Sequence, residues 1–220
     1  LLFFSLLLEL STAQAAIPQS EREALISLYN ATNGDDWTNS DGWTGAPGTE
    51  CNWYGVTCRG DAVHYLLLDK NNLVGTLPKE IGNLTQLTSL SLTGNSLSGT
   101  IPNTLGNLLN LEVLSLADNF FSGSIPNWLG NLLQLETLIL NNNSFTGVIP
   151  SSLGNLSLLK TLFLNSKEMY SGALPNSLRQ LENLTTDDLQ SLRFSPIDKD
   201  NDGIPDEHDN DPAIEAVYKR

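Results

Sequence analysis

Hydrophobic and polar positions repeat with a period of 24 residues along the middle of the chain. Copies of the pattern begin at Val63, Leu87, Leu111 and Leu135, and a fifth copy from Leu159 is one residue longer. Self-similarity at a fixed spacing of this length is typical of solenoids, in which each repeat forms one coil of a stack. Because no single copy can bury its own leucines, we expect stability to come from contacts between neighbouring copies.

Each copy opens with an alternating stretch such as LSL, LIL or LFL, which predicts a short β-strand with its leucines on one side. Three residues after the second leucine comes an asparagine, whose amide can bind backbone groups that water cannot reach. These asparagines are Asn71, Asn95, Asn119 and Asn143. In the fifth copy Lys167 stands at this position, so either Asn165 replaces the asparagine or the ladder of asparagines breaks there.

A glycine and a proline divide the remainder of each copy. The glycine, as in Gly99 and Gly123, supplies the backbone freedom for a second turn. The proline is expected to end the extended piece and to start a short helical turn, after which L-G-N-L leads into the next strand. These prolines are Pro78, Pro102, Pro126, Pro150 and Pro175. A sixth copy begins at Leu181 but loses the pattern, so we expect the stack to end near Leu184.

The N-terminal stretch LLFFSLLLELSTAQA is apolar, with Glu9 as its one charged residue, and is too short to span a bilayer. It ends in Ala13-Gln14-Ala15, a small-x-small sequence typical of signal-peptidase sites. We therefore interpret residues 1–15 as part of a secretory signal peptide and expect a secreted or cell-surface protein that starts near Ala16. The alternative is a buried amphipathic helix, although the stretch shows no polar stripe.

The segment between this stretch and the repeats predicts a helix and a disulfide. Ser20-Glu-Arg-Glu23 reads as a capping box at the start of a helix that carries Ala24, Leu25 and Leu28 on one face. Two cysteines, Cys51 and Cys58, are separated by six residues. In an exported chain a close even pair favours a disulfide, and the alternative is two free buried thiols.

Charge and residue usage argue against several classes of function. The chain carries 25 acidic and 11 basic residues, for a net charge of −14, which repels nucleic-acid phosphates and anionic lipids. His64 and His208 have no partner residues that would form a nucleophile–base pair. Glu112 and Glu136 occupy equivalent positions about 5 Å apart, a separation used by glycosidases, but an open face offers no cleft. We therefore expect no enzymatic activity.

The pattern L-x-x-L-x-L-x-x-N-x-L-x-G-x-I-P-x-x-L-G-N-L resembles the plant-type leucine-rich repeat. The stretch C-N-W-Y-G-V-T-C is similar to the C-x-W-x-G-V-x-C of that family's N-terminal cap, which makes Trp37 and Trp43 core residues of the cap rather than a sugar platform. The resemblance implies an α/β solenoid with parallel strands on a concave face, helical turns on a convex face and a helical cap. The expected divisions are the signal peptide (1–15), the cap (16–62), the repeats (63–184), a C-terminal cap or linker (185–197), an Asp-rich loop (198–212) and a tail (213–220).

Solenoids of this family bind ligands through the concave face, at the positions that flank the strand leucines. This surface is smooth and mildly polar, with aromatic residues near its ends, and suits a flat protein partner or an extended polymer. The candidate ligand-binding residues are Tyr65, Leu67, Asp69, Ser91, Val113, Ser115, Thr137, Ile139, Asn141, Thr161 and Phe163.

The stretch DKDNDGIPDEHD, from Asp198 to Asp209, has aspartates at positions 1, 3, 5, 9 and 12 and a glycine at position 6. This is the ligand spacing of a twelve-residue calcium loop. Pro196 and Pro205 disfavour the flanking helices of an EF-hand, and the run resembles a thrombospondin type 3 repeat. That resemblance implies structural calcium on Asp198, Asp200, Asp202, Ile204, Asp206 and Asp209. The alternative is an unstructured acidic linker.

Three functions follow from these features. The first is a secreted recognition module that binds a protein or surface polymer through the solenoid, with a structural calcium loop at its C-terminal end. The second is a targeting or spacer arm of a larger secreted enzyme whose catalytic domain lies outside this sequence. The third is binding to ice or another crystal surface, because Ser, Thr and Asn recur in regular columns. Fold alone does not choose among them.

Overall fold

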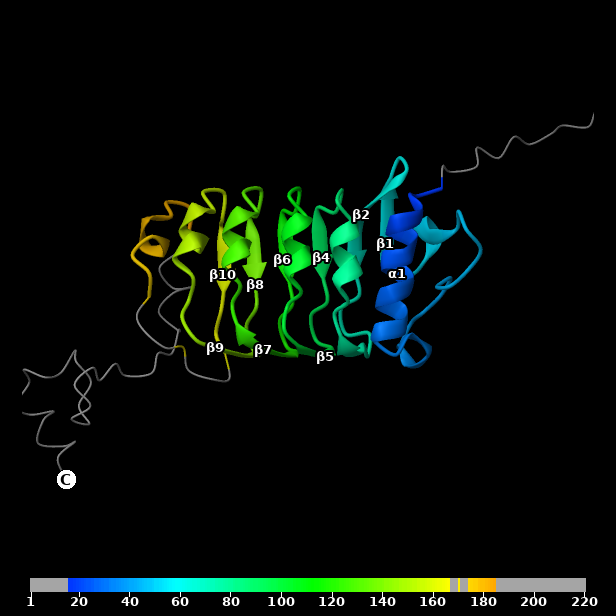
Figure 1. Cartoon of the computed structure of the whole chain (residues 1–220), viewed down its shortest axis with the longest axis horizontal. Coiled ribbons are helices and arrows are strands. Elements are labelled where there is room, and N and C mark those ends of the chain that lie inside the picture. Colours follow the sequence, from blue (N-terminus) through cyan, green and yellow to red (C-terminus); the bar gives the residue numbers. More distant parts are fainter. Residues whose placement is uncertain (1–15, 167–169, 171–173, 185–220) are drawn as a thin grey trace, which may run out of the picture.

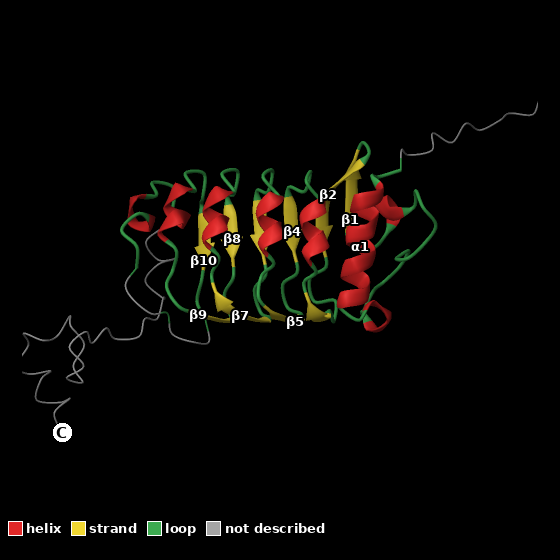
Figure 2. Cartoon of the chain, in the orientation of Figure 1, coloured by secondary structure: helices red, strands yellow, loops and turns green. Residues whose placement is uncertain are grey.

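A computed structural model describes residues 16–166, 170 and 174–184 of the chain. It shows a row of similar coils that begins beside one α-helix, α1 (Gln19–Ala31) (Figure 1). Short helical turns follow one another along one side of the row, and a sheet of strands lies behind them (Figure 2). This is the α/β solenoid with a helical N-terminal cap that the resemblance to leucine-rich repeats implies. Among the helices of the described segments, none is long and apolar enough to cross a membrane.

The larger sheet contains one strand from each of the five coils and one strand, β1, from the cap. Its order is β1-β2-β4-β6-β8-β10, with β1 antiparallel to β2 and every later pair parallel. Leu90 of β4 pairs with Leu114 of β6, which in turn pairs with Leu138 of β8, so the sheet register equals the sequence period. The strands are β1 (Val56–Arg59), β2 (Ala62–Leu67), β4 (Ser89–Ser91), β6 (Val113–Ser115), β8 (Thr137–Ile139) and β10 (Thr161–Phe163).

A second parallel sheet forms where each coil turns again. Its order is β3-β5-β7-β9, with bounds Val74–Thr76, Ser96–Gly99, Phe120–Ser124 and Ser144–Thr146. Gly99 and Gly123 have φ angles of 78° and 80°, a region that side-chain-bearing residues rarely adopt, as the pattern predicts. A 3₁₀ turn then starts directly after each of the first four repeat prolines. These turns are Lys79–Asn83, Asn103–Asn107, Asn127–Asn131 and Ser151–Asn155, and a further turn is Leu178–Gln180.

One continuous apolar core runs from the cap through the coils. The strand leucines Leu90, Leu114 and Leu138 are fully buried, and so are the leucines that begin each copy. Phe121 and Phe145, which occupy the same position in successive coils, stack with ring centroids 6.4 Å apart. Because each leucine contacts the coils on both sides, the core belongs to the stack and not to any single copy.

The predicted ladder of asparagines is present, and its members are almost completely buried. The Asn95 oxygen accepts hydrogen bonds from the backbone amides of Asn71 and Leu73, each 3.0 Å long. The Asn95 amide nitrogen donates to the carbonyl oxygens of Leu68 and Leu92, each at 2.9 Å. One side chain thus satisfies backbone groups of its own coil and of the preceding coil, where water has no access.

In the fifth coil, residues other than asparagine donate hydrogen bonds to the buried carbonyl groups. The Ser166 hydroxyl donates to the carbonyl oxygens of Asn143 and Phe145, at 3.1 and 2.8 Å. Tyr170 is fully buried, and its hydroxyl donates to the carbonyl oxygen of Leu164. The equivalent carbonyl of Leu140 receives the ladder amide of Asn143. Lys167 lies outside the described residues.

The cap covers the first coil with an aromatic cluster. Trp43 lies at centroid distances of 4.7 Å from Trp37 and 5.2 Å from Trp53, and all three rings are buried, as a core function predicts. Cys51 and Cys58 form the predicted disulfide. The Asn71 side chain joins the cap to the stack, because its oxygen accepts from the Asn39 backbone amide and its nitrogen donates to the Asn39 carbonyl.

The capping box predicted at Ser20 is wrong. The helix starts one residue earlier, at Gln19, and its N-cap is Pro18, which forms no side-chain cap hydrogen bond. The Pro18 carbonyl accepts from the backbone amides of Glu21 and Arg22, and the Glu23 carboxylate is held by Gln19 at 3.0 Å. A proline before the helix already fixes the backbone at its entry, so the serine is left inside the first turn.

Removing a ladder amide is expected to destabilise the whole stack. In Asn119→Ala, the Leu97 amide and the carbonyls of Leu92 and Leu116 lose their side-chain partner in a dry interior. We expect the free energy of unfolding to fall by about 2–4 kcal/mol, measured by urea denaturation. The exposed Asn131→Ala is the matched control, and equal losses in both variants would contradict the role of the ladder.

Glu21 is expected to make stability depend on pH. Its carboxylate is buried and accepts from the Val63 backbone amide at 2.8 Å. Burial raises the pKa of Glu21 above its ordinary value of 4.5, against the lowering effect of the Val63 amide. A carboxyl group whose pKa is higher in the folded chain stabilises the fold when protonated, and this contribution is lost as the pH rises through the raised pKa.

Glu21→Gln removes this titration but keeps an acceptor oxygen for Val63. We therefore expect the stability of the variant, relative to the wild type, to increase as the pH rises from below 4.5 through the raised pKa. Denaturant unfolding at a series of pH values measures this difference. Glu23→Gln, at an exposed position on the same helix, is the control. A constant difference between Glu21→Gln and the wild type across the series would show that Glu21 does not titrate as proposed.

Candidate ligand-binding site on the strand face

The strand face is the exposed surface of the larger sheet together with the residues that directly follow its strands. In-register pairing aligns its side chains in rows that cross the coils. One row contains Tyr65, Ser89, Val113, Thr137 and Thr161, and the next contains Leu67, Ser91, Ser115, Ile139 and Phe163. A third row, directly after the strands, contains Asp69, Thr93, Ala117, Asn141 and Asn165.

At the cap end of the strand face, the side chains are occupied by contacts within the protein. The Arg59 guanidinium lies 5.0 Å from the Tyr65 ring centroid and donates a hydrogen bond to its hydroxyl. The Asp69 carboxylate accepts from the Ser91 hydroxyl at 2.5 Å and from the Thr93 backbone amide at 2.8 Å. Leu67 is 43% exposed beside these groups. This end therefore presents a polar surface whose hydrogen-bonding groups largely bind one another.

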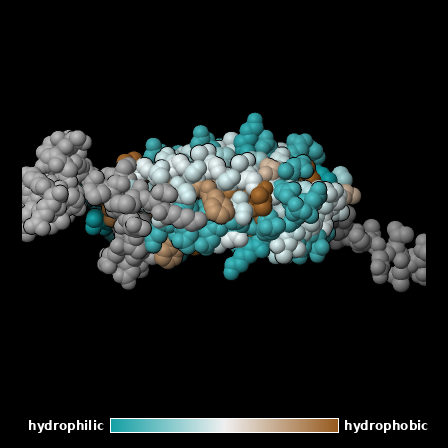
Figure 3. All heavy atoms as spheres, turned by 90° about the horizontal axis from the view of Figure 1, so that it is seen from below, coloured by the Kyte–Doolittle hydropathy of each residue, from teal (hydrophilic) through white to brown (hydrophobic). Residues whose placement is uncertain are grey.

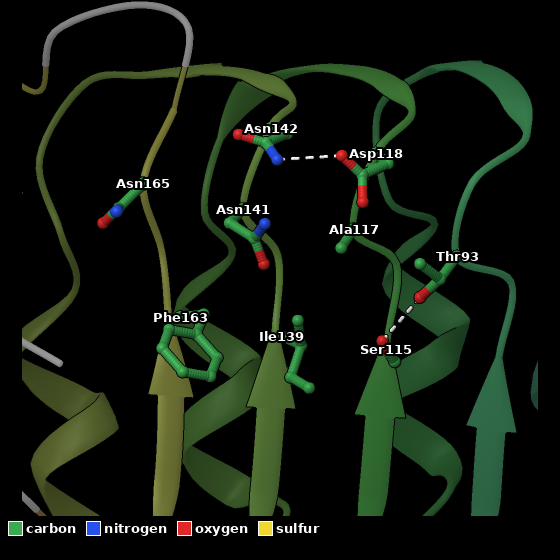
Figure 4. A pocket seen from close by; sticks show the side chains of 9 residues that line it. All are labelled: Thr93, Ser115, Ala117, Asp118, Ile139, Asn141, Asn142, Phe163 and Asn165. Carbon is green, nitrogen blue, oxygen red and sulfur yellow. Dashed lines mark hydrogen bonds between the residues drawn. The ribbon is translucent and has the colours of Figure 1, made fainter.

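At the other end, the strand face contains a hollow of about 510 Å³. Figure 4 shows Ile139 and Phe163 side by side at the ends of neighbouring strands, with Asn141 and Asn165 beyond them. The lining residues are Thr93, Ser115, Ala117, Asp118, Ile139, Asn141, Asn142, Phe163 and Asn165. The hollow thus combines two large apolar side chains, those of Ile139 and Phe163, with several amides.

Hydrogen bonds between coils hold the rim of this hollow. The Asn142 amide donates to the Asp118 carboxylate at 2.8 Å, and the Thr93 and Ser115 hydroxyls lie 2.7 Å apart (Figure 4). Asp118 and Asn142 have φ angles of 54° and 57°, a left-handed conformation that Asp and Asn adopt more readily than most residues. The rim is therefore fixed by backbone conformation and by its own polar contacts before any ligand arrives.

The chemistry of the hollow suits recognition. Phe163 is 39% exposed and offers an apolar surface, while a primary amide such as Asn141 both donates and accepts hydrogen bonds. The Glu136 carboxylate, weighed above as a partner of Glu112, instead forms an ion pair of 2.7 Å with Lys160. Within the described part of the chain, no group of three or more His, Cys, Asp or Glu residues could hold a metal ion.

The structure divides the predicted site residues into two groups. Ser115, Ile139, Asn141 and Phe163 come together in the hollow. The others lie elsewhere on the strand face, namely Tyr65, Leu67, Asp69, Ser91, Val113, Thr137 and Thr161. Whether either group binds a ligand stays a prediction.

The predicted set omits five residues that line the hollow, namely Thr93, Ala117, Asp118, Asn142 and Asn165. The sequence signal for these residues is their position two or three residues after the end of a strand, where the chain bends over the edge of the sheet. The predicted calcium ligands Asp198, Asp200, Asp202, Ile204, Asp206 and Asp209 all lie outside the described residues.

Comparison with protein families gives two matches. Residues 60–213 match the family described as a leucine-rich repeat region, and residues 18–59 match the leucine rich repeat N-terminal domain. A curated relative is the probable inactive receptor kinase RLK902 of Arabidopsis thaliana, 41% identical over 93 residues. The match covers 41% of this chain but only 14% of the relative, so the chain corresponds to a small part of that protein.

Solved structures include plant receptor ectodomains. The SOBIR1 receptor-kinase ectodomain from Arabidopsis thaliana has a TM-score of 0.66 and 28% identity, with 82% of this chain and 94% of that chain covered. The plant peptide hormone receptor RGFR1 in complex with RGF2 has a TM-score of 0.55 and 42% identity, covering 61% of this chain and 21% of that one. A plant ice-binding protein has a TM-score of 0.67 and 25% identity, covering 77% and 57%.

Proposed function

The chain belongs to the leucine-rich repeat family, and on this premise we propose that it is a non-catalytic recognition module that binds an extended peptide segment of a partner protein. The segment crosses the coils on the strand face and is centred on the hollow at Ile139 and Phe163. One observation carries the proposal: successive coils place an apolar side chain that is at least partly open to solvent, and an amide, at the same two positions. These are Ile139 with Asn141, and Phe163 with Asn165.

An extended peptide fits this arrangement because its backbone alternates donors and acceptors while its side chains alternate in direction. Amides such as Asn141 match either kind of backbone group, and the surface between Ile139 and Phe163 accepts an apolar side chain. Asp118 is the charged residue on the rim, and no lysine or arginine is among the described residues that line the hollow. We therefore expect the bound segment to be neutral or basic and to carry at least one large apolar residue.

The family relatives support this class of function. RGFR1 is a plant peptide hormone receptor whose structure contains RGF2, and it shares 42% identity with the part of this chain that it covers. SOBIR1 is matched through its ectodomain, in line with an extracellular location for this chain. The match to RLK902 covers only 14% of that protein, so no kinase property is carried over. A role as the targeting arm of a larger secreted enzyme stays the alternative.

Calcium enters the proposal as a structural ion. The spacing of acidic residues from Asp198 to Asp209 supports one bound ion, with the Ile204 carbonyl as an additional ligand. Five carboxylates at this density repel one another in the absence of a cation. The role of the calcium ion in this proposal is to order the segment that follows the repeats. This segment is distant in sequence from the residues of the hollow.

The peptide site is tested with a phage-displayed library of linear random peptides, selected on the whole chain. We expect Phe163→Ala to weaken the selected peptides about tenfold or more, measured by calorimetry, because the variant removes the largest exposed apolar surface of the hollow. Thr146→Ala, at an exposed position on β9, is the control and should bind as the wild type does. Peptides that bind both variants equally would place recognition elsewhere.

The same titrations in millimolar calcium and in chelator test the role of the ion. A structural strut predicts equal peptide affinity in the two conditions, together with calcium binding that Asp200→Asn and Asp202→Asn weaken. Loss of peptide binding in chelator would make calcium part of the recognition site.

Binding to ice is a second candidate, favoured by the second sheet and by the similarity to a plant ice-binding protein. Hydroxyl side chains pair in register between neighbouring strands of that sheet, as in Thr76 with Ser98 and Ser124 with Thr146. Figure 3 shows this side of the molecule, where hydrophobic atoms form small separate patches among polar ones. Val74, Phe120 and Val148 are the exposed apolar residues that interrupt the array.

Thermal hysteresis and ice shaping by the wild type measure this activity. If ice binds the second sheet, Ser122→Tyr should abolish the effect because a large side chain prevents close approach to a flat surface. Phe163→Ala, on the strand face, should leave the activity unchanged. Absence of hysteresis in the wild type excludes this candidate without affecting the peptide site.

A further inference from the structure

Trp128 departs from the repeat at a position where three of the other coils carry small hydroxyl residues and the first coil carries Glu80. The equivalent residues are Thr104 and Ser152, and Ser177 follows in the longer fifth copy. In each case the hydroxyl donates to a carbonyl of the preceding coil: Thr104 to Lys79, Ser152 to Asn127 and Ser177 to Ser151. A hydroxyl residue at this position therefore suffices to bind the preceding coil, so the fold does not explain why residue 128 is tryptophan.

The indole of Trp128 is held in place by the preceding coil. Its Nε1 donates to the Asn103 side-chain oxygen at 3.1 Å, in place of the hydroxyl-to-carbonyl bond of the other coils. The ring lies against the backbone of Gly106, where an added Cβ would be 3.3 Å from two ring atoms. The side chain is only half-buried, so part of a well-oriented aromatic surface stays open to solvent.

A hollow of about 510 Å³ lies beside this ring, in the region between the end of β7 and the helical turn Asn127–Asn131. This volume falls within the range of about 300–1,000 Å³ that is typical of small-molecule sites. Two hydroxyl residues (Thr100 and Ser124), two amides (Asn103 and Asn127) and two apolar residues (Ile101 and Pro126) line it with Trp128. The described lining contains no charged side chain.

This combination selects a class of ligand. A phosphate, sulfate or uronate would need a cationic partner, which the lining does not provide, and the net charge of −14 disfavours any anion. A wholly apolar ligand would leave the amides and hydroxyls without hydrogen bonds. A neutral sugar has an apolar C–H face that packs on an aromatic ring, and hydroxyl groups that both donate and accept.

We propose that Trp128, with Asn103 and Asn127, forms a binding site for one unit of a neutral polysaccharide. The site lies on the side of the helical turns and the second sheet, separate from the strand face, so it does not depend on the peptide site. The module then binds a neutral glycan on one surface and has a second surface free for a protein segment.

The test uses the whole chain with cellohexaose, xylohexaose and mannohexaose as neutral probes. Hexagalacturonate is the anionic probe, and a random-sequence peptide pool tests the peptide alternative. Binding is followed by calorimetry and by the change in tryptophan fluorescence. Trp128→Ser is the informative variant, because serine occupies the equivalent position in the next coil and the variant should fold. Thermal unfolding checks this, and Phe163→Ala is the control on the strand face.

We expect at least one neutral hexasaccharide to bind the wild type and Phe163→Ala equally. Trp128→Ser should weaken that affinity about tenfold or more, since stacking on the ring is lost. Trp128→Phe, which keeps a ring but loses the N–H bond to Asn103, should give an intermediate affinity. The proposal is overturned if no neutral probe binds, if Trp128→Ser binds as tightly as the wild type, or if the hollow prefers hexagalacturonate or peptide.

Discussion

The structure depends on satisfying backbone groups at the buried turn of every coil. A stack of coils bends its chain inside the core, where each amide and carbonyl must find a partner because water is absent. The ladder asparagines supply these partners, and each reaches both its own coil and the preceding one. This requirement fixes the turn relative to the strand, and with it the period of the sequence and the register of both sheets.

At the two ends of the stack, buried backbone groups also need hydrogen-bond partners, although a neighbouring coil is absent or lacks the ladder asparagine. At the first coil, Asn71 has no preceding repeat, and the cap provides the backbone of Asn39 in its place. At the last complete coil, Tyr170 and Ser166 donate to carbonyls although the asparagine is missing. A ladder can therefore end in either direction, provided that other groups, cap backbone at the first coil and side chains at the last, form the hydrogen bonds that a neighbouring coil would form.

Much of this could be read from the sequence, and the exceptions have physical causes. The period, the strand positions and the ladder depend on residues that recur, so spacing alone predicts them. The disulfide was favoured by a close pair of cysteines in a chain expected to be exported, and the buried aromatic cluster followed from the resemblance to leucine-rich repeat caps. The start of α1 did not follow its capping motif, because Pro18 sets the backbone before Ser20. The hollow of the strand face could be predicted only in part, since it forms where Asp118 and Asn142 bring the chain over the sheet edge in a left-handed conformation. Tyr170 could not be assigned, because a one-residue insertion removes it from the register.

Because the buried residues stabilise the stack, the residues on its surface can vary from coil to coil. Both proposed binding sites lie at surface positions where particular coils depart from the residues of their neighbours. On the strand face, the row that begins with Leu67 continues with Ser91 and Ser115 and then with the larger apolar residues Ile139 and Phe163, where the proposed peptide site lies. On the opposite flank one coil replaces a hydroxyl residue with Trp128 and leaves its neighbours unchanged. In both cases the backbone around the altered residue is set by the same ladder, so the ligand-facing groups are positioned without any contribution from the ligand. The residues that stabilise the stack are thus different from those proposed to bind ligands, so a change at the proposed sites requires no change in the core.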